Sequence, residues 1–175
     1  MKVVSKYTEE LQKLGVTGYT GRPEEDNMIL DWWSELVTTG ELDEIFAKSC
    51  YSLSKFYTLF QRPNWLFYVR DKQGIQLAIW AEPLFSTAFV GMWVAPRARK
   101  SKQVFRSIQL IYYTLFTVFH CVMGVTKKEN LLTTHVKLGY NVVGKVDGLL
   151  DDQPAWIVHL PKKSFDNSRL NPKKR

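Results

Sequence analysis

The sequence predicts a single α/β domain in which helices come first, an antiparallel meander of three strands follows, and a helix–strand–helix–strand–strand order completes a mixed sheet. Apolar residues recur at three- and four-residue spacing up to about residue 60, and the spacing then changes to that of strands. Short turns separate three consecutive strand-like segments. A long amphipathic helix then leads into a short apolar strand, which requires a helical crossover between parallel strands.

The first sixty residues are predicted to be helical. A short helix over 6–14 ends at Gly15. Pro23 opens a stronger helix, because proline suits the first helical position and the acidic residues after it complement the positive end of the helix dipole. Gly40 ends that helix, and one or two further short helices are expected over 41–60.

The second part of the chain is predicted to supply the sheet. Hydrophobic, β-branched and aromatic residues dominate six short segments that turn residues separate. These segments are 65–71, 75–83, 85–96, 120–126, 141–149 and 155–161. With helices expected over 101–117 and 128–140, the order is an antiparallel meander followed by αβαββ.

Residues 107–126 contain no formally charged residue, and their number alone would allow a membrane span. Ser107, Gln109 and His120 interrupt the run, and its second half is rich in β-branched and aromatic residues. A helix that continues into a buried strand explains this mixture better, so no membrane span is expected.

The basic residues are concentrated at the C-terminus. Residues 162–175 hold six basic residues and one acid, which accounts for five of the seven net positive charges. We therefore predict one domain over 1–161 and a basic C-terminal tail over 162–175. Such a tail is either a solvated, frayed terminus or a weak, salt-sensitive contact with nucleic acid or another acidic partner.

Cysteine content and the N-terminus indicate the compartment. Cys50 and Cys121 are the two cysteines, they lack metal-site spacing, and they fit a reducing environment. The N-terminus has no apolar signal core. The protein is expected in the cytoplasm of a (host) cell or in a virion, and is not expected to be secreted.

Two motifs carry a resemblance to a known family. Val94 and Pro96 are followed by Arg99 at the start of the long helix, and the next helix ends in a Lys-Leu-Gly-Tyr sequence at 137–140. Together with the element order, these motifs resemble the GNAT (acyl-CoA N-acyltransferase) superfamily. In that family a loop of the form R-G-x-G-x-G/A holds the coenzyme A pyrophosphate on backbone N–H groups at a helix N-terminus. The resemblance implies these cofactor-binding positions: Val94, Arg99, Lys100, Ser101, Lys102, Gln103 and Val104.

The corresponding loop contains no glycine. Lys100, Lys102 and Val104 occupy the three small positions. Glycine serves there because phosphate must approach the backbone closely and because some φ angles are unusual. We therefore expect weak or no acetyl-CoA binding and no cofactor, or acetyl-CoA if the protein is an enzyme.

His135 is the candidate catalytic residue. In many GNAT enzymes a tyrosine at this position protonates the departing thiolate of coenzyme A, and histidine can act as a general acid near neutral pH. His135 can equally be a surface residue on a helix. Glu82 and Asp147 are candidate general bases, and the three histidines lack metal-site spacing.

The start of the long helix carries a dense basic cluster. It consists of Arg97, Arg99, Lys100, Lys102 and Arg106. Positive charge at this end of a helix is unfavourable, which suggests an anionic group nearby. A solvated helix start, a site for coenzyme A phosphates and a nucleic-acid or protein contact all remain open.

Two functions follow. The glycine-free stretch 100–106 resembles that of small virion-associated proteins of short-tailed bacteriophages that look like eroded GNAT domains. The first hypothesis is thus a degenerate, non-catalytic interaction or structural protein, such as an internal or ejection-associated virion component. It would have protein partners in a larger assembly, with Trp32–Trp33 or Leu84–Phe85 as apolar anchors. The alternative is an acyl-CoA-dependent N-acetyltransferase with an atypical pyrophosphate loop.

Overall fold

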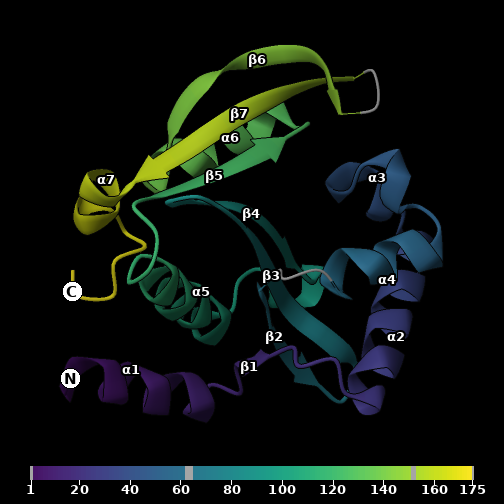
Figure 1. Cartoon of the computed structure of the whole chain (residues 1–175), viewed down its shortest axis with the longest axis horizontal. Helices are drawn as coiled ribbons and strands as arrows, with labels where there is room; N and C mark the ends of the chain where they lie inside the picture. The colour runs from purple at the N-terminus through teal and green to yellow at the C-terminus, as the bar shows by residue number, and fades with distance from the viewer. Residues whose placement is uncertain (1, 62–64, 151–152, 175) are drawn as a thin grey trace.

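The computed structural model describes residues 2–61, 65–150 and 153–174, with side chains from Tyr7 onward except that of Ser49 (Figure 1). The helices are α1 (Lys2–Lys13), α2 (Pro23–Thr39), α3 (Leu42–Ile45), α4 (Leu53–Gln61), α5 (Lys102–Leu115), α6 (Leu132–Lys137) and α7 (Lys162–Asn167). The strands are β1 (Thr17–Gly18), β2 (Trp65–Asp71), β3 (Gly74–Leu84), β4 (Thr87–Val94), β5 (Cys121–Thr126), β6 (Asn141–Leu150) and β7 (Gln153–Pro161).

Within the described residues the strands form one mixed sheet in the order β1-β2-β3-β4-β5-β7-β6. Strands β2, β3 and β4 pair antiparallel, as the short turns predict. Strand β4 pairs parallel with β5, and α5 is the crossover between them. The predicted α/β class and mixed sheet are confirmed. The sequence patterns missed the two-residue β1 and the helix α7, and the helix expected over 128–140 is an α-helix only over Leu132–Lys137.

The uncharged stretch 107–126 is divided between two elements. Helix α5 ends at Leu115, and β5 begins at Cys121. Among the described residues, no helix is both long enough and apolar enough to cross a membrane.

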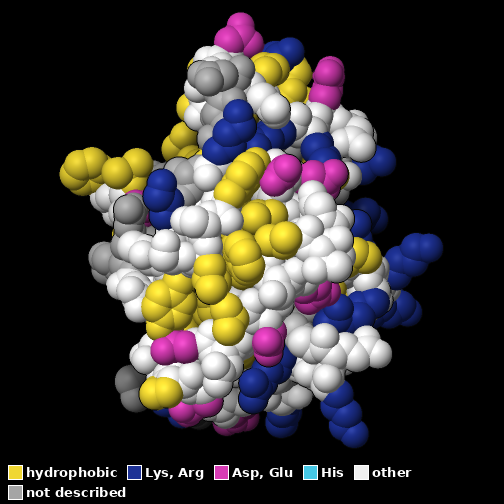
Figure 2. Space-filling view, turned by 90° about the vertical axis from the view of Figure 1, so that its right-hand side faces the viewer, with side chains coloured by type: hydrophobic (Ala, Val, Ile, Leu, Met, Phe, Trp, Pro, Cys, Tyr) yellow, Lys and Arg dark blue, Asp and Glu magenta, His cyan; other side chains and the backbone are white. Residues whose placement is uncertain are grey.

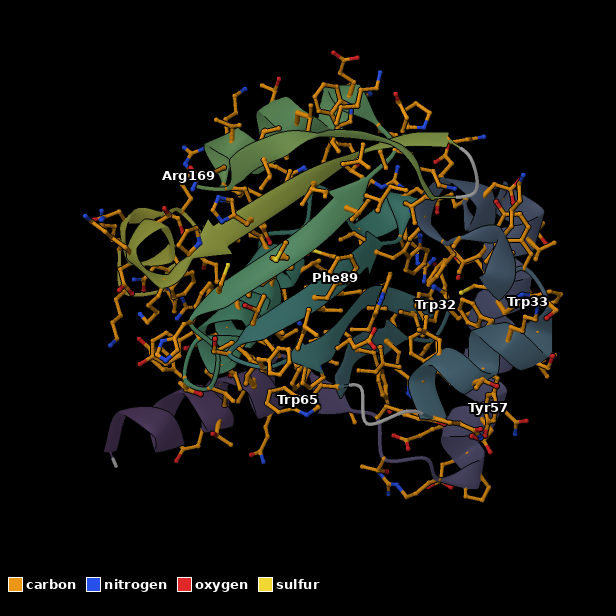
Figure 3. All side chains as sticks on the ribbon, turned by 45° about the horizontal axis from the view of Figure 1, so that its top comes forward. Trp32, Trp33, Tyr57, Trp65, Phe89 and Arg169 are labelled. Atoms are coloured by element: carbon orange, nitrogen blue, oxygen red, sulfur yellow. The ribbon has the colours of Figure 1, made fainter. Side chains whose placement is uncertain are left out.

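Helices cover both sides of the sheet (Figure 1). Helices α2, α3 and α4 gather on one side, whereas α5 lies on the other with α1 beyond it. Trp32 of α2 is 1% exposed and sits among the rings of an aromatic cluster (Figure 3). The other rings of the cluster are Phe46, Phe56, Phe60, Trp80 and Trp93. Because Trp32 is buried there, it cannot serve as the exposed anchor that the sequence suggested.

The start of α2 shows how the predicted helix boundary is built. Pro23 occupies the first turn and Gly40 ends the helix with φ 71°, as expected. Glu25 is buried and accepts hydrogen bonds from the backbone N–H groups of Thr20 and Arg22 and from the hydroxyl of Tyr68. Burial alone would raise the pKa of this carboxyl, but the hydrogen bonds outweigh it and lower the pKa.

The C-terminal segment is folded onto the domain. Residues 162–167 form α7, and the Phe165 side chain is fully buried, stacked on Phe116 at 4.3 Å between ring centroids. Leu170 is 1% exposed, and Gln109 donates a hydrogen bond to the backbone carbonyl of Arg169. A solvated, frayed end is therefore not what the structure shows. The domain boundary at residue 161 stays a prediction.

Candidate active site

The two parallel strands at the centre of the sheet separate along their length. Strand β4 pairs with β5 only from Thr87–Cys121 to Phe89–Met123. Beyond these pairs the strands diverge, although β5 remains paired with β7 through Thr126. The peptide groups of β4 that face the gap are therefore left without a strand partner on that side.

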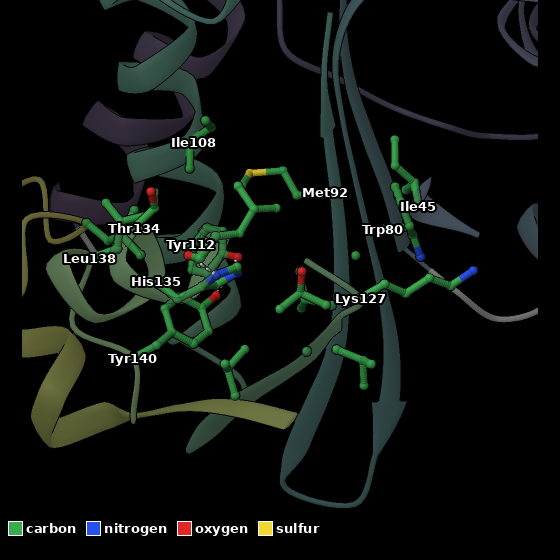
Figure 4. Close-up of a pocket in the computed structure, with 18 of the residues that line it drawn as sticks. Ile45, Trp80, Met92, Ile108, Tyr112, Lys127, Thr134, His135, Leu138 and Tyr140 are labelled. Atoms are coloured by element: carbon green, nitrogen blue, oxygen red, sulfur yellow. Dashed lines mark hydrogen bonds between the residues drawn. The ribbon is translucent and has the colours of Figure 1, made fainter. Parts of the chain in front are cut away.

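A cavity of about 250 Å³ lies in this gap (Figure 4). The two strands contribute Val90, Gly91 and Met92 on one side and Gly124, Val125 and Thr126 on the other. Helix α5 contributes Phe105, Ile108 and Tyr112, and α6 contributes Thr134 and His135. Pockets that enclose drug-sized molecules usually measure ~300–1,000 Å³, so this cavity suits a slender part of a larger ligand.

Two glycines line the cavity at positions where a side chain would be crowded. A Cβ atom built on Gly124 would lie 3.1 Å from the carbonyl oxygen of Val90, across the gap between the strands. One built on Gly91 would lie 2.0 Å from the indole of Trp80. Neither residue has a left-handed backbone conformation, so the constraint is one of space. It is severe at Gly91, whereas at Gly124 a side chain would press on the backbone of β4.

His135 lines the cavity, as its candidate role requires. Its Nδ1 lies 2.8 Å from the carbonyl oxygen of Leu131, one helical turn earlier. A carbonyl oxygen only accepts, so Nδ1 carries a proton and Nε2 is the nitrogen available to a ligand. In the neutral ring Nε2 can accept a proton, and in the charged ring it can donate one. The edge of the ring meets Tyr140, with 5.3 Å between ring centroids.

Two buried tyrosines complete the polar part of the cavity wall. The hydroxyl of Tyr140 donates a hydrogen bond to that of Tyr112 at 2.7 Å, and both residues line the cavity (Figure 4). Burial raises the pKa of Tyr112 to about 12, against a smaller opposing effect of the Tyr140 hydrogen bond. Burial and the nearby Tyr112 hydroxyl raise the pKa of Tyr140 well above its ordinary value. Both hydroxyls therefore stay protonated at neutral pH and can act as hydrogen-bond donors.

The glycine-free loop has an ordinary backbone. Among the described non-glycine residues only Phe85 has a positive φ, so Lys100, Lys102 and Val104 are under no left-handed strain. Val104 is 2% exposed and points into the core, whereas the two lysines are exposed. Val104 therefore does not crowd the loop, contrary to the argument from sequence.

Ser101 caps the helix that begins after this loop. Its hydroxyl accepts a hydrogen bond from the backbone N–H of Val104 at 3.3 Å, and α5 begins at the next residue. The N–H groups of the first turn of a helix have no intrahelical partner. The backbone N–H groups of Lys102 and Gln103 therefore belong to the positive end of α5. This end precedes Phe105, which lines the cavity.

The three arginines of the basic cluster are engaged within the chain. Arg106 forms a bidentate ion pair with Glu10 of α1, at 2.6 and 2.9 Å. Arg97 pairs with Glu35 at 3.0 Å. Arg99 pairs with the buried carboxylate of Glu41 and donates to the carbonyl of Val94 at 3.2 Å.

The cluster is therefore no continuous free patch. Glu10, Glu35 and Glu41 are anionic groups of the kind that the sequence suggested near the helix start. No ion pair joins Lys100 or Lys102 to another residue of the described chain, so these two lysines carry the charge that remains available at the start of α5.

The two candidate general bases lie elsewhere. Glu82 of β3 and Asp147 of β6 are exposed, and neither lines the cavity. Of the candidate catalytic groups, the structure brings only His135 to this place. No three His, Cys, Asp or Glu side chains of the described residues are arranged to hold a metal ion.

The order of elements and the mixed sheet define a domain with the fold of the GNAT acetyltransferases. Solved structures that share it include RimJ of Mycobacterium smegmatis in complex with CoA-disulfide, at TM-score 0.64 and 13% identity over 89% of this chain and 86% of that one. Spermidine N-acetyltransferase of Vibrio cholerae in complex with CoA and spermine matches at TM-score 0.65 and 14% identity, over 87% and 99%.

A third structure is the ribosomal-protein-S5-alanine acetyltransferase of Vibrio fischeri, at TM-score 0.63 and 9% identity, over 84% of this chain and 93% of that one. At such identities the likeness shows the fold alone. No protein-family model matches the chain, and no curated protein matches its sequence.

Proposed function

We propose that the protein is an acyl-CoA-dependent N-acyltransferase whose pyrophosphate loop works without glycine. The observation that supports this most is the open gap between β4 and β5, with Gly124 where a side chain would press on the Val90 carbonyl across it and His135 on its wall. A protein that had abandoned this site would be free to close the gap with larger residues. The similar structures with bound CoA add support, because they share the fold.

The residues present fit acetyl-CoA, which would supply an acyl group as a thioester. A narrow, mostly apolar gap with unpaired strand peptide groups suits an extended arm that carries amide groups. Lys100 and Lys102 are exposed beside the positive end of α5, where phosphates are favoured. The lysine side chains would help to hold the coenzyme A pyrophosphate, which the family's loop holds on the backbone N–H groups of its glycine-rich segment.

The groups on the wall fit transfer of an acyl group to an amine. His135 presents Nε2, which in the neutral ring can take the proton that the attacking amine must lose. The Tyr112 hydroxyl receives the hydrogen bond of Tyr140 and keeps its own proton to donate toward the departing sulfur. An amine acceptor is proposed because the similar structures are those of spermidine and ribosomal-protein-alanine acetyltransferases.

Calorimetric titration with acetyl-CoA at low salt tests the proposal. We expect micromolar binding, and we expect the charge-reversed variant Lys100→Glu/Lys102→Glu to bind at least ~10-fold more weakly, because two favourable contacts with phosphate become repulsive. The variant Lys163→Glu/Arg169→Glu makes the same change of net charge at two exposed residues of the C-terminal segment and should bind like the parent. Equal loss in both variants, or no binding by the parent protein, would contradict the proposal.

A second candidate function is the non-catalytic interaction protein of a larger assembly, such as an internal virion component of a phage. Exposed apolar residues favour it. Phe85 is 96% exposed at the β3–β4 turn with φ 55°, and Leu84 beside it is 54% exposed. A non-glycine residue in this conformation costs free energy, which makes the turn a place to look for a function. Figure 2 shows a band of hydrophobic side chains over the side where α2, α3 and α4 lie in Figure 1.

This second candidate carries different expectations. It predicts no acetyl-CoA binding in the titration above and co-sedimentation with partner proteins that is lost in Phe85→Ser. A weak nucleic-acid contact through the basic residues after 161 belongs to the same candidate and would weaken with rising salt. An acyltransferase requires neither result.

A further inference from the structure

The C-terminal segment is wedged between α5 and the end of α6. The side-chain amide of Gln109, a buried residue of α5, donates a hydrogen bond to the carbonyl oxygen of Arg169 at 2.7 Å. On the other side, a Cβ atom built on Gly139 would lie only 2.6 Å from the Cβ atom of Ser168. In Figure 1 the chain after α7 accordingly runs beside α5. These contacts place Leu170, the residue after Arg169, between the two helices.

Leu170 is part of the wall of the cavity between β4 and β5. It is 1% exposed, so its side chain is packed on all sides. Two other residues of the wall come from the same parts of the chain that hold the C-terminal segment. Tyr112 lies in the next turn of α5 after Gln109, and Tyr140 follows Gly139. Leu170 therefore lines the cavity on the side where the hydroxyls of Tyr112 and Tyr140 meet.

Buried groups hold the backbone around Leu170 in place. Its N–H donates a hydrogen bond to the hydroxyl oxygen of Ser168 at 3.1 Å. The next residue, Asn171, is buried and donates from its side-chain amide to the carbonyl oxygen of Asp166 at 3.2 Å. Leaving buried polar groups without partners is costly. A ligand chain that reached Leu170 would therefore meet a side chain that cannot withdraw without breaking these hydrogen bonds.

We propose that Leu170 restricts the acyl group of the substrate to a short one, acetyl or propionyl. This inference rests on the proposed function, in which the Tyr112 hydroxyl donates toward the departing sulfur. The acyl carbon is bonded to that sulfur, so an acyl chain begins beside the two tyrosines, and its extension meets Leu170. A close-packed wall rejects extra length, since one methylene group in an apolar pocket changes the preference for a substrate by about 10- to 200-fold.

The size of the cavity agrees with a short acyl group. Its volume of about 250 Å³ lies below the ~300–1,000 Å³ of pockets that enclose drug-sized molecules. The arm that carries the thioester would take up part of this volume, which leaves little of it for the acyl chain. The size of the residue at position 170 then decides how long that chain can be.

Calorimetric titration of the whole chain with CoA, acetyl-CoA and butyryl-CoA tests the proposal. The parent protein should bind butyryl-CoA about 10-fold or more weakly than acetyl-CoA, because the longer chain meets Leu170. Leu170→Ala shortens the side chain to a methyl group and should shift this ratio by about 10-fold or more in favour of butyryl-CoA. Leu170→Val is a milder change and should shift the ratio in the same direction by a smaller factor. CoA carries no acyl group, so its Kd should stay close to that of the parent in both variants.

Leu36→Ala is the matched control. Leu36 of α2 is fully buried, but it does not line the cavity. This variant should lose stability, as Leu170→Ala does, and keep the preference of the parent protein for acetyl-CoA. Far-ultraviolet circular dichroism checks that each variant is folded.

The titrations separate a failure of this inference from a failure of the proposed function. If the parent protein bound acetyl-CoA and butyryl-CoA equally well, or if Leu170→Ala and Leu170→Val weakened both alike, the role of Leu170 would be refuted while acyl-CoA binding stood. If the parent protein bound neither CoA nor acetyl-CoA, the proposed function would be refuted, and the role of Leu170 with it.

Discussion

Replacement of Phe165 by alanine is expected to lower the free energy of unfolding by about 3–5 kcal/mol, the usual cost of removing a buried aromatic side chain. Phe165 is fully buried and stacks on Phe116 at the end of α5. Its loss leaves a cavity between α7 and α5 and releases the C-terminal segment. Urea unfolding followed by tryptophan fluorescence measures the change.

The neighbouring exposed residue provides the control. Lys163→Ala should change the free energy of unfolding by no more than about 0.5 kcal/mol, because the side chain is exposed. If Phe165→Ala were as mild as Lys163→Ala, the C-terminal segment would not be part of the folded domain in solution.

Gly91→Ala is expected to destabilise the protein by about 1–3 kcal/mol or more, the cost of overpacking a core. The added methyl group would lie 2.0 Å from the Trp80 indole, and Trp80 is stacked on Phe46 at 4.9 Å between ring centroids. Either the indole or strand β4 must move, and both lie at the wall of the cavity. We therefore expect weaker acetyl-CoA binding together with the loss of stability.

Gly18→Ala is the matched control for this change. Gly18 is exposed in β1, its φ is not left-handed, and a Cβ atom there meets nothing within 4 Å. Alanine at such a position is neutral or stabilises by about 0.4–1 kcal/mol through the unfolded state. Thermal unfolding of both variants separates a steric effect at Gly91 from a general effect of replacing glycine in a strand.

The order of strands could be predicted because the chain marks it locally. Turn residues separate 65–71 from 75–83, and the apolar run after residue 100 changes from helical to strand character before Cys121. These are properties of neighbouring residues. The partners of the arginines could not be predicted in this way, since Arg106 meets Glu10 and Arg99 meets Glu41 only when distant segments pack together.

The position of the C-terminal segment likewise could not be predicted from local sequence patterns. Its lysines and arginines predict a solvated tail, but Phe165 and Leu170 decide its position. Two apolar residues among six basic ones give a weak pattern, and the residues that bury them, such as Phe116, come together only in the folded domain. His135, the candidate from sequence, lies on the cavity wall. Tyr112 lies in the uncharged stretch 107–126, where nothing in the sequence distinguished it from core residues.

The central claim is that the gap between β4 and β5 is a ligand site for acyl-CoA. Titration with acetyl-CoA, followed by amide nitrogen–proton NMR spectra with assigned resonances, tests it most directly. The account predicts the largest shifts at Gly91 and Gly124 in the gap and at Lys102 and Gln103 at the start of α5. Unchanged spectra at saturating acetyl-CoA, or shifts confined to residues away from the gap such as α7, would contradict it.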